Sequence, residues 1–311
     1  MKLIIVGISF AFIYYKIFYN SAIVSSSKII FEKNNFSKHY ILIGITLFLM
    51  LINWSFEAIK WKILIEKIQK IKFLTSLKAV MAGITVSAFT PNRVGEFGGR
   101  IFFLESQNRT KAIVLTFLGN VAQLLVTIVV GAFLFAIYLA VFTTLKNYFL
   151  IAIDVILFSV IILLIFIYFK NERFKKYFLK LKFFRKHAEK INLFFTYSTK
   201  ELLKILLFSF FRYVVFTLQF YFLLCIFDVE ISFFSAIVLI GMTFSATTFI
   251  PTFAFTELGV RSSAAILFLG ILSTNALGIA LASISLWIVN IAIPALIGSF
   301  YILKIPIANR K

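Results

Sequence analysis

Long apolar runs alternate with short polar segments along the whole chain. A helix needs about 20 mostly apolar residues to cross the hydrocarbon core of a bilayer. Six runs predict full membrane spans, at residues 3–19, 40–57, 112–142, 148–169, 203–227 and 275–303. The run 112–142 is longer than a straight crossing requires, which predicts either a strongly tilted helix or a break near Gly131. Two further apolar regions, 78–108 and 233–271, are each interrupted by a polar motif. We therefore predict an all-α polytopic membrane protein of roughly eight apolar segments, forming a single integral membrane domain over residues 1–311.

Composition supports this class and excludes others. Of the 311 residues, 61% are hydrophobic and 14% are charged, against about 45–50% and about 25% in soluble domains. These values exclude a soluble enzyme, a disordered chain and a nucleic-acid-binding domain. The net charge of +20 comes from 32 Lys and Arg that lie mostly between apolar runs, which is the pattern of a topology signal. The first run follows Lys2 but no A-x-A-like cleavage site follows it, which favours a retained helix over a signal peptide.

The basic residues predict which segments face the cytoplasm. Segments 60–78 and 170–190 are rich in Lys and Arg, and Lys304, Arg310 and Lys311 follow the last run, whereas 143–147 and 228–232 carry little positive charge. The positive-inside rule places the basic segments and both termini in the cytoplasm, at a bacterial-type cytoplasmic membrane. Segment 170–200 mixes basic residues with Phe and Leu, which predicts an amphipathic helix against anionic headgroups. A solvated loop is the alternative for this segment.

The same charges constrain the two interrupted regions. Region 78–108 begins in the cytoplasm, and Arg109 and Lys111 follow it, so this region should enter from the cytoplasm and return to it. Region 233–271 follows an outside segment, and the last span must run from outside to inside. This second region should therefore enter from outside and return there. Charge alone thus predicts two re-entrant helical hairpins that enter from opposite faces.

The two interruptions resemble each other in sequence. The first reads Ala88-Phe89-Thr90-Pro91 and, after four residues, Glu96-Phe97-Gly98-Gly99-Arg100; the second reads Thr248-Phe249-Ile250-Pro251 and, after five residues, Glu257-Leu258-Gly259-Val260-Arg261. The proline ends the incoming helix, and the glutamate favours the N-terminus of the returning half-helix. The shared x-F-x-P…E-[FL]-G-x-R pattern predicts an inverted repeat, the plan of transporters whose site lies near the midplane of the membrane.

Charged side chains at the interruptions are the first candidates for a binding site. Glu96 and Arg100, and likewise Glu257 and Arg261, are four residues apart and can pair on one helix face. Arg93 lies near them in the sequence. A charge at the centre of a bilayer costs several kcal/mol by most scales, so this group predicts a polar cavity. Half-helix N-termini and Arg93 both suit an anion such as a lipid phosphate. The alternative is a structural salt bridge within each hairpin.

Polar residues inside the spans complete the candidate set. Three pairs share helical faces, namely Arg212 with Gln219, Asn120 with Gln123, and Asn53 with Glu57. We assign the first pair to substrate binding and the other two to contacts between helices. Structural roles in the motifs at the interruptions are assigned to Pro91, Gly95, Gly98, Pro251 and Gly259. Trp54 and Trp61 are expected at the cytoplasmic interface as aromatic anchors. No Cys or His spacing resembles a metal site and no cofactor motif is found, so we expect neither metal nor cofactor.

Several stretches together carry a family resemblance. They are Asn53-Trp54, Glu57, Lys60-Trp61-Lys62, the T-P-N-R-V-G-E-F sequence from Thr90 to Phe97, Arg212-Tyr213, Gln219-Phe220 and Glu257-Leu258-Gly259-Val260-Arg261. Over about residues 40 to 303 the chain resembles the transmembrane domain of lysylphosphatidylglycerol synthases, also described as flippase-like domain proteins. The resemblance implies a protein that moves polar-headed lipids between leaflets. Full-length members carry a further aminoacyl-transferase domain, and we expect no aminoacyl transfer from this chain. Phe253, Ala254 and Phe255 stand where the family often has glycines.

Three functions are compatible with these features. The leading prediction is an integral membrane protein that binds and translocates a phosphate-containing lipid, with membrane lipids as its partners and no nucleic acid. The second is a membrane-embedded lipid transferase that uses Glu96 or Glu257 as a base. The third is a scaffold or partner of a cell-envelope glycosyltransferase or other envelope-biosynthesis enzyme. The oligomeric state stays open.

Overall fold

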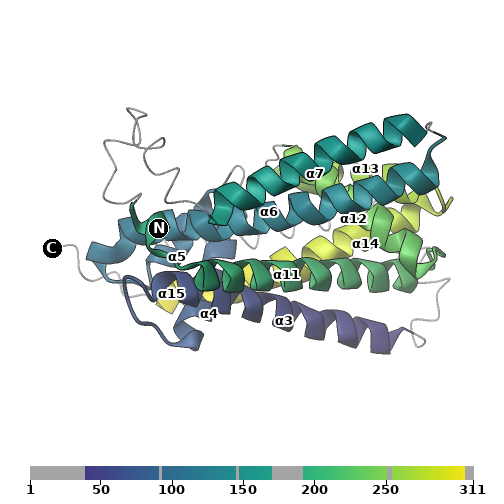
Figure 1. Cartoon of the computed structure of the whole chain (residues 1–311). Helices are drawn as coiled ribbons and strands as arrows, with labels where there is room; N and C mark the ends of the chain where they lie inside the picture. The colour runs from purple at the N-terminus through teal and green to yellow at the C-terminus, as the bar shows by residue number, and fades with distance from the viewer. Residues whose placement is uncertain (1–38, 91–92, 145–146, 170–191, 251–253, 305–311) are drawn as a thin grey trace.

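The computed structural model describes residues 39–90, 93–144, 147–169, 192–250 and 254–304, and every regular element in these ranges is helical. The helices form an elongated bundle, in which they run roughly along one common direction (Figure 1). The first predicted span, most of the basic segment 170–200, Pro91 and Pro251 lie outside the described residues. The all-helical class is confirmed for the described part of the chain.

Five helical segments of the described chain are long and apolar enough to cross a membrane. They are α3 (Tyr40–Ile65), α6 (Arg109–Phe142), α7 (Asn147–Phe169), α11 (Thr199–Ile226) and the run formed by α14 (Ala276–Trp287), η5 (Ile288–Ala292) and α15 (Ile293–Lys304). They correspond to five of the six predicted spans. Helix α6 has 34 residues and continues through Gly131, so the break proposed there is wrong. At 1.5 Å per residue it is about 51 Å long, more than a straight crossing needs.

Four shorter helices occupy the two interrupted regions. They are α4 (Phe73–Ser87) with α5 (Gly95–Ile101), and α12 (Phe233–Phe249) with α13 (Ala254–Leu269). The longest has 17 residues, which gives about 26 Å of helix, less than the core of about 30 Å. Each interrupted region is therefore two short helices that meet at a break. The connections 66–72 and 102–108 flank the first hairpin. Two shorter helical turns, η3 (Ser106–Asn108) and η4 (Leu193–Thr196), lie in connections.

The first hairpin begins and ends at the same end of the bundle. The side-chain oxygen of Gln69, in the connection before α4, accepts hydrogen bonds from the backbone N–H of Glu105 (3.2 Å) and from Asn108 Nδ2 (3.3 Å). Both donors lie in the connection after α5. We call this the Gln69 end. The start of α11 lies here as well, because the hydroxyl of Tyr197 donates to the carbonyl of Leu64 at 2.6 Å.

The second hairpin begins and ends at the opposite end. The Nδ2 of Asn275, just before α14, donates to the carbonyls of Phe227 (3.0 Å) and Asp228 (3.3 Å), which lie before α12. We call this the Asn275 end. His39, at the start of α3, lies 3.9 Å from Asp228. Helices α3 and α11 are consequently antiparallel, and in Figure 1 α4 and α5 lie toward one end of the bundle and α12 and α13 toward the other.

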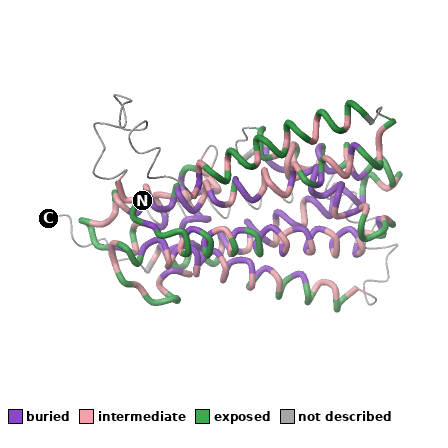
Figure 2. The backbone as a smooth tube through the Cα atoms, viewed as in Figure 1, coloured by how far each residue is buried: buried purple, intermediate pink, exposed green. Residues whose placement is uncertain are grey.

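The two hairpins have largely separate packing partners. Helices α4 and α5 pack against each other and against α3, α6 and α15, whereas α12 and α13 pack against α6, α11 and α14. Helix α7 packs along α6 at the periphery, and its outer surface is exposed over most of its length (Figure 2). Apolar side chains on that surface are what a helix in contact with lipid requires.

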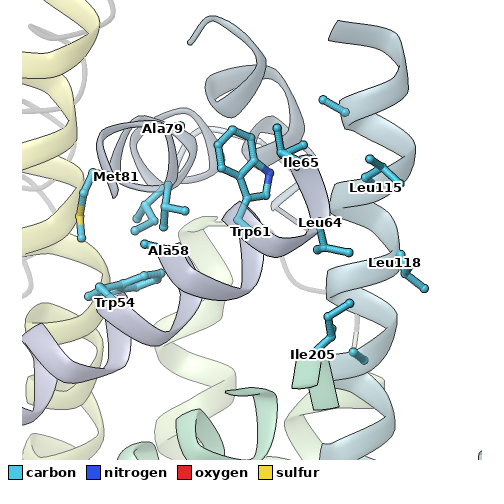
Figure 3. Packing of buried hydrophobic residues seen from close by; sticks show 14 of the residues in the cluster. Trp54, Ala58, Trp61, Leu64, Ile65, Ala79, Met81, Leu115, Leu118 and Ile205 are labelled. Atoms are coloured by element: carbon cyan, nitrogen blue, oxygen red, sulfur yellow. The ribbon is translucent and has the colours of Figure 1, made fainter. Parts of the chain in front are cut away.

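Trp61 and Trp54 do not act as anchors at the membrane surface. Trp61 is fully buried at 0% exposure and packs among Leu64, Ile65 and Ala79 (Figure 3). Its indole N–H donates to Thr116 Oγ1 at 3.0 Å. Trp54 is 6% exposed. The expectation of an aromatic belt here is wrong, because α3 continues to Ile65 and keeps both indoles inside the bundle.

Candidate functional site

Glu57 of α3 lies at the centre of a buried cluster of charges. Its carboxylate accepts a hydrogen bond from Arg100 Nη2 of α5 at 2.9 Å and one from Arg212 Nη1 of α11, and it pairs with Lys60 Nζ at 2.7 Å. Glu57 is 2% exposed and Arg100 and Lys60 are 1% exposed. Buried charges persist only when they are paired and hydrogen-bonded. One carboxylate thus joins α3, α5 and α11 inside the bundle.

The predicted place of Lys60 was also wrong. Lys60 is the first residue of the basic segment 60–78 that we predict to face the cytoplasm. The structure instead buries it about one helical turn beyond Glu57, on the same face of α3. The spacing of three residues between Glu57 and Lys60 was the available signal, because residues at i and i+3 share a helix face.

A chain of side-chain amides extends the cluster toward α14 and α15. Arg212 Nε donates to Asn53 Oδ1 (3.0 Å), Asn53 Nδ2 donates to Asn290 Oδ1 (3.1 Å), and Asn290 Nδ2 donates to Gln219 Oε1 (3.1 Å). Gln219 Nε2 then donates to the carbonyl of Thr46 at 2.9 Å. Asn53, Gln219 and Asn290 are at most 1% exposed. The pairs Asn53–Glu57 and Arg212–Gln219, each predicted from helical spacing, therefore meet in one network.

Asn290 is the site residue that sequence reasoning missed. It lies in η5, a π-helical turn in which the chain makes a wider helix. Pro294 follows it and has no N–H to donate to the carbonyl of residue 290, which explains why the regular α-helical hydrogen bonding fails here. An Asn four residues before a Pro in an apolar run was the signal available in the sequence.

Each break carries the ion pair that was predicted within it. Arg100 Nη2 contacts Glu96 Oε1 in α5, and Arg261 Nη2 lies 3.0 Å from Glu257 Oε1 in α13. A third pair was not predicted, because it crosses between the hairpins. Arg93 Nη2 lies 2.5 Å from the same Glu257 oxygen. The two breaks, 164 residues apart in the chain, therefore meet through one carboxylate.

Glycines allow the close approach of α4 and α5. A Cβ at Gly95 would lie 2.5 Å from the carbonyl oxygen of Val86, and one at Gly99 would lie 2.5 Å from that of Ala82. Apart from the adjacent residues and the backbone of its own helix, no described atom lies within 4 Å of such a Cβ at Gly98 or Gly259. The steric need for glycine is thus at Gly95 and Gly99 rather than at Gly98 and Gly259.

A cavity of about 330 Å³ lies between the two breaks and the central helices. Its polar lining includes Arg93, Glu96, Asn120, Gln123, Thr127, Arg212, Tyr213, Thr247, Thr248, Arg261 and Asn290, and its apolar lining includes Trp54, Phe216, Phe244 and Leu286. Arg100, Gln219 and Glu257 lie outside this lining and contact residues of the wall. The guanidinium of Arg212 lies 5.2 Å from the centre of the Trp54 ring, within the range of a cation–π contact.

Two polar atoms of the wall have no partner in the described part of the chain. They are the indole N–H of Trp54 and the hydroxyl of Tyr213, and each residue is 6% exposed. Buried polar groups in proteins nearly always have a hydrogen-bond partner. A polar ligand or water in the cavity would supply one.

A comparison with protein families assigns the chain to a family. The family model described as "Lysylphosphatidylglycerol synthase TM region" matches residues 5–298. The chain belongs to this family. Comparisons with curated proteins and with solved structures gave no match. The resemblance seen in the motifs is thus confirmed over nearly the whole chain.

Membership of the lysylphosphatidylglycerol synthase transmembrane family makes this chain an integral membrane protein, in agreement with the five membrane-length helices in its described part. The family match also includes the segment 5–38, which precedes the described residues. In the described ranges, no group of three His, Cys, Asp or Glu side chains is placed to hold a metal ion. The chemistry of the site consists of arginines, carboxylates and amides around a cavity.

Proposed function

We propose that the chain binds the phosphate-bearing headgroup of a membrane lipid in this cavity and moves the lipid between leaflets. The observation that supports it most directly is the charge of the cavity wall. Three arginines, Arg93, Arg212 and Arg261, line the cavity against one glutamate, Glu96. Arginine is the residue best suited to phosphate, because its planar fork of donors matches the phosphate oxygens.

The size and setting of the cavity suit a headgroup. Small-molecule sites have volumes of about 300–1,000 Å³, and this cavity lies at the lower end of that range. The headgroup occupies it while the acyl chains stay in apolar surroundings. Trp54 and Tyr213, whose donors have no partner among the described residues, provide further hydrogen bonds to phosphate or glycerol oxygens.

The opposed hairpins provide the movement in this proposal. We take the breaks to be the two halves of an inverted repeat, with the cavity opening alternately to each side as one half moves against the other. The Gln69 end would face the cytoplasm of a bacterial cell, since Lys67, Lys70, Lys72, Arg109, Lys111, Lys200 and Lys204 lie in its connections and helix starts. The Asn275 end carries Asp228 and Glu230. This arrangement follows the positive-inside rule.

Transport in proteoliposomes tests the proposal. The purified chain is reconstituted with a fluorescent phospholipid, and a reducing agent that cannot cross the membrane reports the rate at which the label changes leaflet. The double variant Arg93→Gln/Arg261→Gln should lower this rate at least about tenfold, a loss that corresponds to about 1.4 kcal/mol. Arg100 and Arg212 are less suitable targets, because both belong to the more deeply buried cluster around Glu57, whereas the side chains of Arg93 and Arg261 are 40% and 29% exposed.

Lys204→Gln is the matched control, since Lys204 is an exposed cation near the start of α11. It should leave the rate unchanged. Equal rates for the wild type and the double variant would contradict the proposal. A chain that transports no lipid but copurifies at fixed stoichiometry with an envelope-biosynthesis enzyme would favour the role of a partner protein.

A further inference from the structure

We propose that Glu257 and the anionic group of the ligand compete for Arg93, and that binding exchanges the one for the other. This inference rests on the proposed function, because it assumes that the cavity receives an anion. It adds a coupling mechanism: the exchange releases the ion pair that joins the two hairpins.

The geometry around Glu257 supports the exchange. One oxygen of its carboxylate contacts both Arg93 Nη2 (2.5 Å) and Arg261 Nη2 (3.0 Å). The side chains of Arg93 and Arg261 are 40% and 29% exposed and line the cavity, whereas that of Glu257 is 10% exposed and lies behind them. A phosphate in the cavity thus reaches the arginines directly and competes with Glu257 for their N–H groups.

Arg93 is the cation that changes partner. Arg261 lies on the same helix as Glu257, four residues away, so that pair survives any movement of α13 as a unit. Arg93 belongs to the other hairpin. Arginines elsewhere in the site are already held, since Arg212 contacts Glu57 and Asn53, and Arg100 contacts Glu57 and Glu96. The phosphate and the carboxylate of Glu257 therefore compete for the positive charge of Arg93.

The link between Arg93 and Glu257 also constrains the backbone. Arg93 has a φ angle of 58°, in the left-handed region that residues other than glycine rarely adopt. Strained residues of this kind persist where surrounding contacts hold them and often belong to switching segments. Since α4–α5 and α12–α13 otherwise pack largely against different helices, loss of this ion pair allows the first break to relax independently of the second.

Binding of glycerol 3-phosphate, the phosphate end of a deacylated phospholipid, tests the exchange in detergent-purified full-length protein. Glu257→Gln keeps the shape of the side chain and removes its charge. If Glu257 competes with the ligand, this variant should bind glycerol 3-phosphate at least about tenfold more tightly than the wild type, because close charge pairs couple at least that strongly. If Glu257 only supports the site, the variant should bind more weakly or equally.

The controls use another carboxylate and another ligand. Glu201→Gln removes an ion pair with Lys67 that lies at the Gln69 end, away from the cavity, and should leave the affinity unchanged. Uncharged glycerol should bind the wild type and Glu257→Gln equally weakly, since it offers no anion to compete.

The distance between two spin labels, one near each break, provides a second readout of the exchange. Cys225 is the single cysteine, so a Cys225→Ser background carrying Val94→Cys and Phe249→Cys places one spin label near each break. Both positions are exposed, at 58% and 70%. Glycerol 3-phosphate should shift the distances between the labels toward those of the protein that also carries Glu257→Gln.

The outcomes separate the two proposals. Tighter binding by Glu257→Gln together with the ligand-induced shift supports the exchange. Binding by the wild type without tighter binding by Glu257→Gln overturns the exchange and leaves the proposed function standing. No binding of glycerol 3-phosphate by either protein overturns both.

Discussion

Three buried cations share the carboxylate of Glu57, and Arg100 also contacts Glu96. Arg100, Arg212 and Lys60 come from three positions in the chain, and each lies within contact of Glu57. Burying any one of them alone would cost several kcal/mol, because water stabilises an isolated charge far better than an apolar interior does. We infer that Glu57 is the residue on which the assembly of the centre depends most.

Neutralising Glu57 should therefore cost more stability than neutralising a surface carboxylate. Glu57→Gln leaves three buried cations with less negative charge, and breaking a buried ion pair in this way typically costs about 3–5 kcal/mol. The free energy of unfolding, followed by an SDS titration of the detergent-solubilised protein, measures the loss. Glu201→Gln is the control, with an expected loss of at most about 1 kcal/mol, since exposed pairs contribute little. Equal losses in the two variants would argue against a central role for Glu57.

Individual residues show where sequence reasoning succeeded and where it stopped. The pairs Glu96–Arg100 and Glu257–Arg261 were predictable because helical spacing alone brings their side chains together. The pair Arg93–Glu257 was not, because it joins segments that only the folded bundle brings into contact. Lys60 was misplaced because every lysine near the end of a predicted span was assumed to be solvated. In the structure, the ion pair with Glu57 stabilises the buried charge of Lys60.

At the scale of elements, the short helices of the first hairpin fit together through small residues. Gly83 of α4 leaves room for Arg100, since a Cβ there would lie 2.9 Å from Arg100 Cγ. Gly99 of α5 faces the backbone of α4, and Gly98 beside it faces open space. Helix α5 has only seven residues, so its position depends on this packing rather than on its own helix propensity.

The neighbouring glycines Gly98 and Gly99 provide a matched comparison. Gly99→Ala forces a methyl group against Ala82 and should destabilise the protein by about 1–3 kcal/mol, the usual cost of overpacking. Gly98→Ala adds the same methyl group in open space and should be neutral or stabilising by up to about 1 kcal/mol, because alanine favours helix. The SDS titration measures both. A larger loss for Gly98→Ala than for Gly99→Ala would contradict the described packing of α4 on α5.

At the scale of the whole molecule, the two hairpins start from opposite ends and their breaks meet at the centre. Hydrogen bonds of Gln69 and Asn275 close the two hairpins at their respective ends. The ion pair of Arg93 with Glu257 then joins the breaks. Polar side chains are thus gathered at mid-length of the bundle, surrounded by helices whose outer surfaces are apolar.

Labelling of single cysteines in cells tests how this molecule lies in the membrane. In the Cys225→Ser background, Lys70→Cys and Gln107→Cys mark the Gln69 end, and Glu230→Cys and Thr274→Cys mark the Asn275 end. A thiol reagent that cannot cross the membrane should label the second pair in intact spheroplasts and the first pair only after permeabilisation. Labelling of Gln107→Cys from outside would show that the first hairpin crosses the membrane instead of returning.

From the sequence we could predict the class of protein, the five membrane-length helices of the described ranges, the positions of the two breaks and the ion pair within each. These features depend on local properties, namely the length of apolar runs, the loss of a donor at proline and the spacing of side chains on one helix. Only the folded bundle shows that Glu57 contacts three cations, that Asn290 joins the network and that Arg93 reaches Glu257. Contacts between distant segments depend on how all the helices pack together, and no local pattern specifies that packing.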